Sequence, residues 1–192
     1  MSAPSQNLIP EPGPDATPLS TALLHRVLQP YQPNARYVHR ATMVGRGCGI
    51  TPRLHAPDSW LRVSGECGFA APCYIEATGH FNAVEANITF NQLLYLGMAE
   101  TVRARLLPEL RHWTLDDFFR AQLPDVLIAD YHARFRAPMG SRAYRGSFTF
   151  IEVVARPDRR QLRLQTRAEF RDDHGGECTI DASIALVNWQ PA

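Results

Sequence analysis

The stretch of sequence that decides the fold is TGHFNAVEANITFNQLLYLGM, residues 78–98, and its apolar character continues with hardly a break to about Leu107. Apolar residues recur along it at i, i+3 and i+7, the spacing of one helical face, and others fill the opposite side. The first face carries Phe81, Val84, Ile88, Tyr95, Met98, Val102 and Leu106, and the other side carries Phe90, Leu93, Leu94 and Leu96. A helix that is apolar nearly all round is a buried helix, so the sequence predicts one long central helix.

Polar residues stand out in the first turn of this predicted helix. They are His80, Asn82 and Glu85, and Asn91 interrupts the apolar stripe further along. Buried polar groups need hydrogen-bond partners, so the helix start is either well capped or used in chemistry. The dipeptide at 78–79 suits a cap, and the unpaired N–H groups of a first helical turn favour developing negative charge.

Alternating apolar and polar residues on both sides of the helix predict strands. In the clearest case, residues 161–171, apolar side chains face one way and mostly charged side chains face the other. The predicted strands are residues 36–45, 59–69, 125–137, 143–156, 161–171 and 177–189.

Two short helices are predicted from their capping residues. Ser20 can cap a helix that Pro30 ends, with Leu23, Leu24, Val27 and Leu28 on its apolar face. The sequence Thr114-Leu115-Asp116-Asp117 is a capping box that opens a second helix, which stops at Pro124.

Chain length and composition fit one domain with a substantial core. The 192 residues are 45% hydrophobic and 20% charged. Residues 1–18 hold five prolines among small and polar residues. We therefore expect a flexible leader over residues 1–18 and one domain over residues 19–192.

Charge and cysteine content exclude several classes of protein. A net charge of +1 argues against a nucleic-acid binder, and all twenty basic residues are arginine, which excludes a Schiff-base lysine and a P-loop. The four cysteines form no C-x-x-C pair, so we expect no metal site and the reduced thiols of a cytoplasmic protein. No apolar run approaches the ~20 residues of a membrane span.

The predicted order of elements is two strands, a long helix, a short helix and four strands in a meander. These elements make an antiparallel sheet of about six strands wrapped around one long central helix, the α+β architecture called the hot-dog fold. One such sheet covers its helix on one side only. We therefore expect two copies to pair, with the site formed between them.

Several motifs resemble the signature of the FcoT-like hot-dog enzymes. The main matches are Tyr74-Ile75, Thr78–Glu85 and Phe90–Leu93, and the supporting ones are Leu28–Tyr31, Arg36-Tyr37, Trp113–Asp117 and Arg134–Pro138. Enzymes of this family are long-chain acyl-CoA thioesterases. Relatives in isonitrile-lipopeptide and β-amino acid macrolactam pathways add glycine to a 2-enoyl-acyl-carrier-protein and release the adduct. The resemblance spans about residues 20–140.

The resemblance also implies where the site lies and what it binds. Tyr31, Tyr74, Asn82 and Asn91 fall where the family has its active-site tyrosines and asparagines, and Phe81 lies within the same motif as a substrate-binding residue. The implied partners are glycine and an acyl carrier protein or acyl-CoA, whose phosphopantetheine carries the substrate, with no separate cofactor. The implied assembly is a homo-oligomer, a dimer or a trimer of dimers, with no nucleic acid and no membrane.

The glycine reaction needs particular groups. A 2-enoyl thioester becomes electrophilic at its β-carbon when its oxygen is stabilised as an enolate, which the helix N–H groups and the Tyr74 hydroxyl could do. Free glycine is mostly an ammonium at neutral pH, so His80 or Glu85 must accept a proton before the nitrogen attacks. The candidates for binding the glycine carboxylate are Arg36, Arg134 and Arg136.

Each candidate also has a purely structural interpretation. Tyr74 alone is typical of a strand tyrosine, Asn82 of a capping residue, and Glu85 of an acid that complements the helix dipole. Asn91 lies nine residues past Asn82, close to the opposite helical face, so it would complete the site of a neighbouring subunit or bridge helix and sheet.

Three functions therefore stay open, in order of preference. The first is glycine addition to an enoyl thioester followed by thioester hydrolysis. The second is a plain acyl-CoA or acyl-carrier-protein thioesterase. The third is a hot-dog module without catalysis that binds acyl chains or only assembles.

Overall fold

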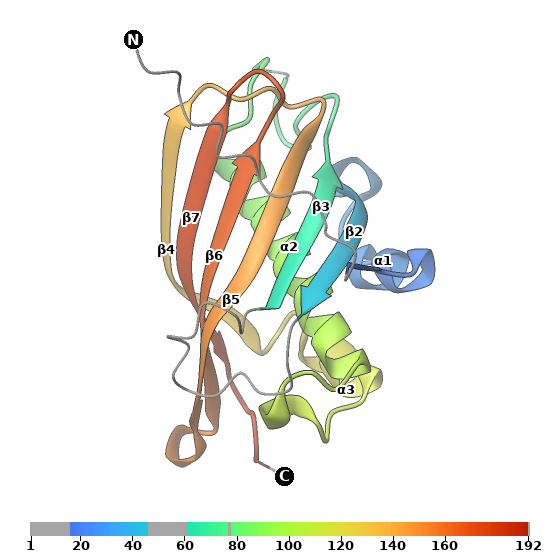
Figure 1. Cartoon of the computed structure of the whole chain (residues 1–192), viewed down its shortest axis with the longest axis vertical. Coiled ribbons are helices and arrows are strands. Elements are labelled where there is room, and N and C mark those ends of the chain that lie inside the picture. The colour runs from blue at the N-terminus through green and yellow to red at the C-terminus, as the bar shows by residue number, and fades with distance from the viewer. Residues whose placement is uncertain (1–15, 46–60, 77, 192) are drawn as a thin grey trace.

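The computed structural model describes residues 16–45, 61–76 and 78–191 of the chain (Figure 1). Most of the predicted leader and most of the segment predicted to link the first two strands lie outside the described residues. The strands are β1 (Thr17–Pro18), β2 (Val38–Gly45), β3 (Leu61–Cys67), β4 (Val126–Ala137), β5 (Tyr144–Arg156), β6 (Gln161–Arg171) and β7 (Glu177–Leu186). The helices are α1 (Thr21–Leu28), α2 (Ala83–Arg103) and α3 (Leu115–Ala121), with single 3₁₀ turns at Pro33–Ala35, Pro108–Leu110 and Pro157–Arg159.

The strands form one antiparallel sheet in the order β1-β2-β3-β5-β6-β7-β4. All six predicted strands are present, and β1 is a seventh that the sequence did not predict. Its residues Thr17 and Pro18 pair with Met43 and Thr42. The last two residues of the predicted leader therefore belong to the sheet, because two ladder positions beside β2 hold them.

Helix α2 lies across one face of the sheet, as the hot-dog prediction requires (Figure 1). It contacts β2, β3 and β5, and α1 and α3 pack against it as well. Glycines permit this close approach. A Cβ atom at Gly97 of the helix would lie 3.0 Å from Phe150, and one at Gly146 of the sheet would lie 2.8 Å from Leu93. Larger residues at these two positions would push the helix away from the sheet.

The central helix is shorter than predicted at both ends. It begins after Asn82, whose side chain caps it, rather than at the dipeptide 78–79. It ends at Arg103 rather than near Leu107, because Arg105 adopts a left-handed backbone conformation with φ 54°. Among the helices of the described chain, none combines the length and the apolar character that crossing a bilayer requires.

Helix α2 is also less evenly buried than its sequence predicts. Val84 is 44% exposed and Ile88 is only half-buried, whereas Phe90, Leu93 and Leu96 are fully buried. The difference arises because the sheet, α1 and α3 cover most of the helix surface but leave the stripe containing Val84 and Ile88 partly open. This stripe begins in the first turn of the helix, next to the predicted site.

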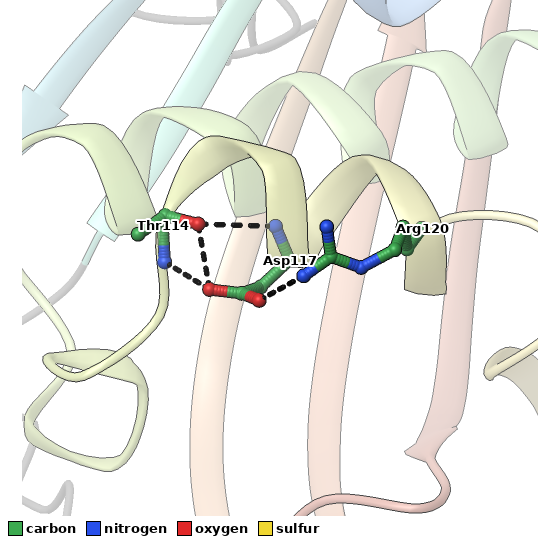
Figure 2. Close-up of polar contacts among 3 residues, drawn as sticks. All are labelled: Thr114, Asp117 and Arg120. Carbon is green, nitrogen blue, oxygen red and sulfur yellow. Dashed lines mark hydrogen bonds and ion pairs between the residues drawn. The ribbon is translucent and has the colours of Figure 1, made fainter.

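The two short helices confirm their predicted caps. The Ser20 hydroxyl accepts the Leu23 N–H at 3.2 Å at the start of α1. At the start of α3, Thr114 and Asp117 form the reciprocal capping box, and Arg120 pairs with the same aspartate (Figure 2). The hydrogen bonds from Thr114 lower the pKa of Asp117, with a smaller contribution from Arg120.

Candidate active site at the start of the central helix

The candidate site is built where the chain passes from β3 into α2. Tyr74 lies on this connecting segment, not on a strand, and its hydroxyl oxygen is 3.1 Å from Asn82 Nδ2 and 3.2 Å from Asn82 Oδ1. Asn82 Oδ1 already accepts the Val84 N–H at 2.9 Å. The amide NH₂ can donate to the phenol oxygen, and the phenol can donate either to the second lone pair of Asn82 Oδ1 or to another acceptor.

Glu85 is the third residue of this cluster and contacts the backbone of Asn82. Its Oε2 accepts the backbone N–H of Asn82 at 3.3 Å, which completes the capping box of α2. Its side chain is fully buried, and its second oxygen, Oε1, has no hydrogen-bond partner within the described residues. A buried carboxylate oxygen without a donor is unusual in a folded protein and calls for an explanation, such as a bound ligand.

Three phenols face the Glu85 carboxylate. Burial raises the pKa of Tyr37, of Tyr74 and, most strongly, of Tyr144, and the negative charge of Glu85 adds to each shift. At Tyr74 the hydrogen bond with Asn82 acts in the opposite direction. All three hydroxyls therefore stay protonated at neutral pH and can serve as hydrogen-bond donors.

Thr89 and Tyr144 form a hydrogen-bonded pair that joins the helix to the sheet one turn after Glu85. The Thr89 hydroxyl donates to the Glu85 carbonyl at 2.8 Å and lies 2.7 Å from the Tyr144 hydroxyl. Since Thr89 uses its proton on the carbonyl, Tyr144 is the donor to Thr89. The first two turns of α2 are thus fixed to strand β5.

The connecting segment is held from several sides. The Phe81 N–H donates to Met139 O at 2.8 Å, and the Cys73 N–H donates to the Tyr37 hydroxyl at 3.3 Å. At the start of the segment, a Cβ atom at Gly68 would lie only 2.2 Å from Arg142 O. Only glycine fits this contact, which brings the segment against the link between β4 and β5.

His80 is close in sequence to this cluster but does not join it. Its ring Nδ1 lies 3.1 Å from Thr78 O, and its side chain is exposed. No hydrogen bond from the imidazole to Tyr74, Asn82 or Glu85 occurs within the described part of the chain. Its predicted role as proton acceptor stays a prediction.

The remaining predicted residues lie in other places. Tyr31 and Arg36 are together at the end of α1, where Arg36 Nε donates to Tyr31 O at 3.1 Å, and burial raises the pKa of Tyr31. Asn91 donates to Asn87 O at 3.0 Å on its own helix. Arg134, on β4, pairs with Asp181 at 3.3 Å. None of these side chains contacts Tyr74 in the described structure, so their assignment to one site stays a prediction.

Phe81 and Arg136 also have structural partners. Phe81 is 2% exposed and packs against Tyr144 and Phe170, with ring centroids 4.9 and 5.5 Å apart. Arg136 lies 3.8 Å from Glu177 on the neighbouring strand. The ring of Phe81 thus anchors the start of α2 in the core.

Sequence reasoning missed Tyr37, Thr89 and Tyr144. In the sequence, Tyr37 belongs only to a supporting motif, and Tyr144 does not differ from the other residues of an alternating strand. The one usable signal was the i+4 spacing from Glu85 to Thr89, which places both on the same helical face. The sheet register that brings Tyr144 to this face is a tertiary property.

A separate hollow of about 570 Å³ lies away from this cluster. Arg40, Glu66 and Arg145 pair side by side there on β2, β3 and β5. The hollow is lined by residues of β1, β2, β3, β5 and the start of α1, and none of Tyr74, Asn82 and Glu85 belongs to it. Within the described residues, no group of histidine, cysteine and acidic side chains could hold a metal ion.

Comparisons with known proteins agree on one family. The family described as FcoT-like thioesterase domain matches residues 26–186 of this chain. A (2E)-enoyl-[ACP] glycyltransferase from Streptomyces coeruleorubidus is 36% identical, over 87% of this chain and 96% of that protein. Another protein of the same name, from Mycobacterium marinum, is 33% identical, over 90% of this chain and 89% of that protein.

Solved structures are similar in fold at low sequence identity. The dehydratase domain of RzxB from Pseudomonas fluorescens matches with a TM-score of 0.51 and 8% identity, over 88% of this chain and 49% of that one. A putative thioesterase from Shewanella oneidensis matches with a TM-score of 0.49 and 15% identity, over 88% and 99% of the two chains. At this identity the first likeness concerns the arrangement of helix and sheet only.

Proposed function

The chain belongs to the FcoT-like thioesterase family, and from this premise we propose that it adds glycine to a (2E)-enoyl thioester and then hydrolyses the thioester. The nitrogen of glycine adds to the β-carbon of the enoyl chain, which the phosphopantetheine of an acyl carrier protein or CoA carries. The product is a 3-(carboxymethylamino) fatty acid, a precursor for secondary metabolism in the cytoplasm. The observation that carries the proposal is the hydrogen-bonded Tyr74–Asn82 pair beside an unpartnered Glu85 oxygen.

The start of α2 suits an enolate. Addition to the β-carbon places negative charge on the thioester oxygen, and donors already aimed at that oxygen lower the barrier. The Tyr74 hydroxyl is such a donor, and the positive end of the helix dipole supports it. Tyr74 is 50% exposed, so a substrate can reach its hydroxyl from solvent.

Hydrolysis would use the same place. Water would attack the carbonyl carbon after the glycine adduct has formed, and the oxygen anion would be stabilised by the same donor. A thioesterase that only hydrolyses is therefore the second candidate function, which the family description supports by itself. In that case a saturated and an unsaturated thioester would be hydrolysed alike.

Glycine also brings a carboxylate, which needs a cation. The predicted partners are Arg36, Arg134 and Arg136. Each has a polar contact already: Arg36 with backbone carbonyls, Arg134 with Asp181 and Arg136 with Glu177. A charge-assisted contact with one arginine would distinguish glycine from a simple amine.

The decisive experiment follows labelled glycine. The protein is incubated with a (2E)-enoyl thioester and ¹⁵N-glycine, and mass spectrometry should find the 3-(carboxymethylamino) fatty acid with one labelled nitrogen. Ethylamine should replace glycine poorly, and glycine should not accelerate hydrolysis of a saturated thioester. Equal hydrolysis of both thioesters with no label in any product would leave only the thioesterase.

We further propose that the active form is a homo-oligomer built from dimers. Strand β4 pairs with β7 on one side only in the described sheet, and Leu127, Ile128 and Phe135 are exposed along it. A long edge strand with exposed apolar residues pairs readily with another chain. Sedimentation at micromolar concentration should find at least a dimer, and a folded monomer there would contradict the proposal.

A further inference from the structure

Helix α2 carries two buried glutamates whose surroundings differ. Glu100 is 4% exposed, and its two carboxylate oxygens bind the Arg103 guanidinium at 2.6 and 2.7 Å. Glu85 is 0% exposed, and only one of its oxygens has a partner, the Asn82 N–H. No ion pair reaches Glu85 from any residue that the structure describes.

The groups that face Glu85 come from three different elements, and none of them is a cation. They are Tyr37 before β2, Tyr74 on the connecting segment and Tyr144 on β5. A buried carboxylate without a cation is costly to a protein, and the helix dipole and one N–H offset only part of that cost. A ligand that brings a positive charge or a transferable proton to this place would be stabilised.

We propose that Glu85, rather than His80, accepts the proton of the incoming amine, and that the Tyr74 hydroxyl passes the proton to it. This inference rests on the proposed function, because glycine is the substrate that brings an ammonium. Of the two proton acceptors that the sequence left open, it prefers Glu85 to His80.

The relay connects a buried acceptor with an exposed donor. Glu85 is buried, so a substrate does not meet it directly, whereas Tyr74 is half exposed and its hydroxyl interacts with the Glu85 carboxylate, which raises the pKa of Tyr74. Asn82 Nδ2 donates to the Tyr74 oxygen, and the phenol proton can turn from Asn82 Oδ1, at 3.2 Å, toward Glu85. The ammonium of glycine gives one proton to the phenol oxygen while the phenol gives its own proton to Glu85 Oε1. The nitrogen is then neutral with a lone pair, Tyr74 is unchanged, and Glu85 is a carboxylic acid.

The cycle closes without any other reactant. When the nitrogen adds to the β-carbon, the electron pair of the double bond moves to the thioester oxygen as an enolate. The α-carbon of the enolate then takes the one proton that Glu85 holds, and the nitrogen of the adduct stays a secondary ammonium. Glu85 returns its proton through Tyr74 in this step, which restores the carboxylate.

His80 offers no such path. Its ring contacts Thr78 of its own loop, and it has no hydrogen bond to Tyr74 or to Asn82 in the described structure. Its exposed imidazole would exchange protons with water rather than with an amine bound at the helix start.

The test compares pH profiles of glycine addition for four proteins. Glu85→Gln keeps the capping box, because a glutamine oxygen can still accept the Asn82 N–H. The variant can use only the small fraction of glycine that is already deprotonated in solution. Its kcat/KM for glycine should therefore fall on the order of 10²-fold near pH 7 and rise about tenfold per pH unit up to about pH 8.5. The wild-type profile should be flat over the same range.

Glu100→Gln is the matched control, because it changes a second buried glutamate of the same helix. This variant and His80→Gln should keep the flat profile. Should Glu85→Gln fail to fold, Tyr74→Phe interrupts the relay at its other end and should show the same rising profile. If the wild type forms the adduct, a flat profile for Glu85→Gln or a rising profile for His80→Gln would overturn this inference and leave the proposed function standing. The absence of any adduct from the wild type would overturn the proposed function with it.

Discussion

The two ends of helix α2 differ in how they stabilise the charge of a buried glutamate. Each end buries a glutamate, but Glu100 is neutralised by Arg103 within one helical turn, whereas Glu85 has one backbone N–H and, among the residues that the structure describes, no cation. At the C-terminal end the Thr101 hydroxyl also has a partner on the same helix, since it donates to Met98 O at 2.7 Å.

The difference teaches where to look for function. A protein that can pair one buried glutamate so completely has no structural reason to leave another unpaired. The polar groups at the N-terminal end instead include the exposed Tyr74, whose hydroxyl bonds Asn82. The unpaired oxygen of Glu85 therefore makes the N-terminal end the place to look for a binding site.

The largest expected effect comes from removing the amide behind Tyr74. Asn82→Ala should lower kcat on the order of 10²–10³-fold, because the Tyr74 hydroxyl loses its partner and the enolate loses an aligned donor. The lost cap should cost about 1 kcal/mol of unfolding free energy. Steady-state kinetics and urea unfolding measure the two quantities.

Thr114→Ala is the control for that variant, since it removes the cap of α3 at a similar cost in stability and lies away from the site. Its kcat should match that of the wild type. Wild-type turnover in a folded Asn82→Ala protein would return Asn82 to a purely structural role.

A smaller effect separates the two glutamates by stability. Glu100→Gln should lower the free energy of unfolding by about 1–2 kcal/mol, because it breaks two charge-assisted bonds, one partner of which is half exposed and can turn to water. Glu85→Gln should change it by less than about 0.5 kcal/mol or raise it, since Oε1 has no bond to lose. Equal losses for both variants in chemical unfolding would show that Glu85 has a partner after all.

The smallest expected effect uses the capping box of α3, where the acid is exposed and fully paired (Figure 2). Bonds from Thr114 hold the pKa of Asp117 below its usual value. A depressed carboxylate pKa stabilises the fold above the unfolded-state pKa of about 3.9, and this stabilisation is lost as the pH falls through the folded pKa. Asp117→Asn should therefore lower the midpoint of thermal unfolding slightly at pH 6 and less at pH 3, as measured by circular dichroism. A larger loss at the lower pH would contradict this sign.

Much of the site could be predicted because its parts are local. The step from Asn82 to Glu85 is one helical turn, so the two residues meet wherever the helix begins, and Tyr74 is only eight residues upstream. The start of the helix is harder to predict from the sequence. Asn82 competes with the dipeptide 78–79 as a cap, and the choice depends on how the segment packs on Met139.

The sequence by itself determined the order of strands and helices, the buried central helix and the caps of α1 and α3, because periodicity and capping act over a few neighbouring residues. Only the tertiary structure decided that Tyr37 and Tyr144 face Glu85, that Glu85 lacks a cation while Glu100 has one, and that Phe81 lies in the core. These facts depend on sheet register and on the close approach that Gly97 and Gly146 permit. Contacts between residues far apart in the chain are set by packing, which no local pattern encodes.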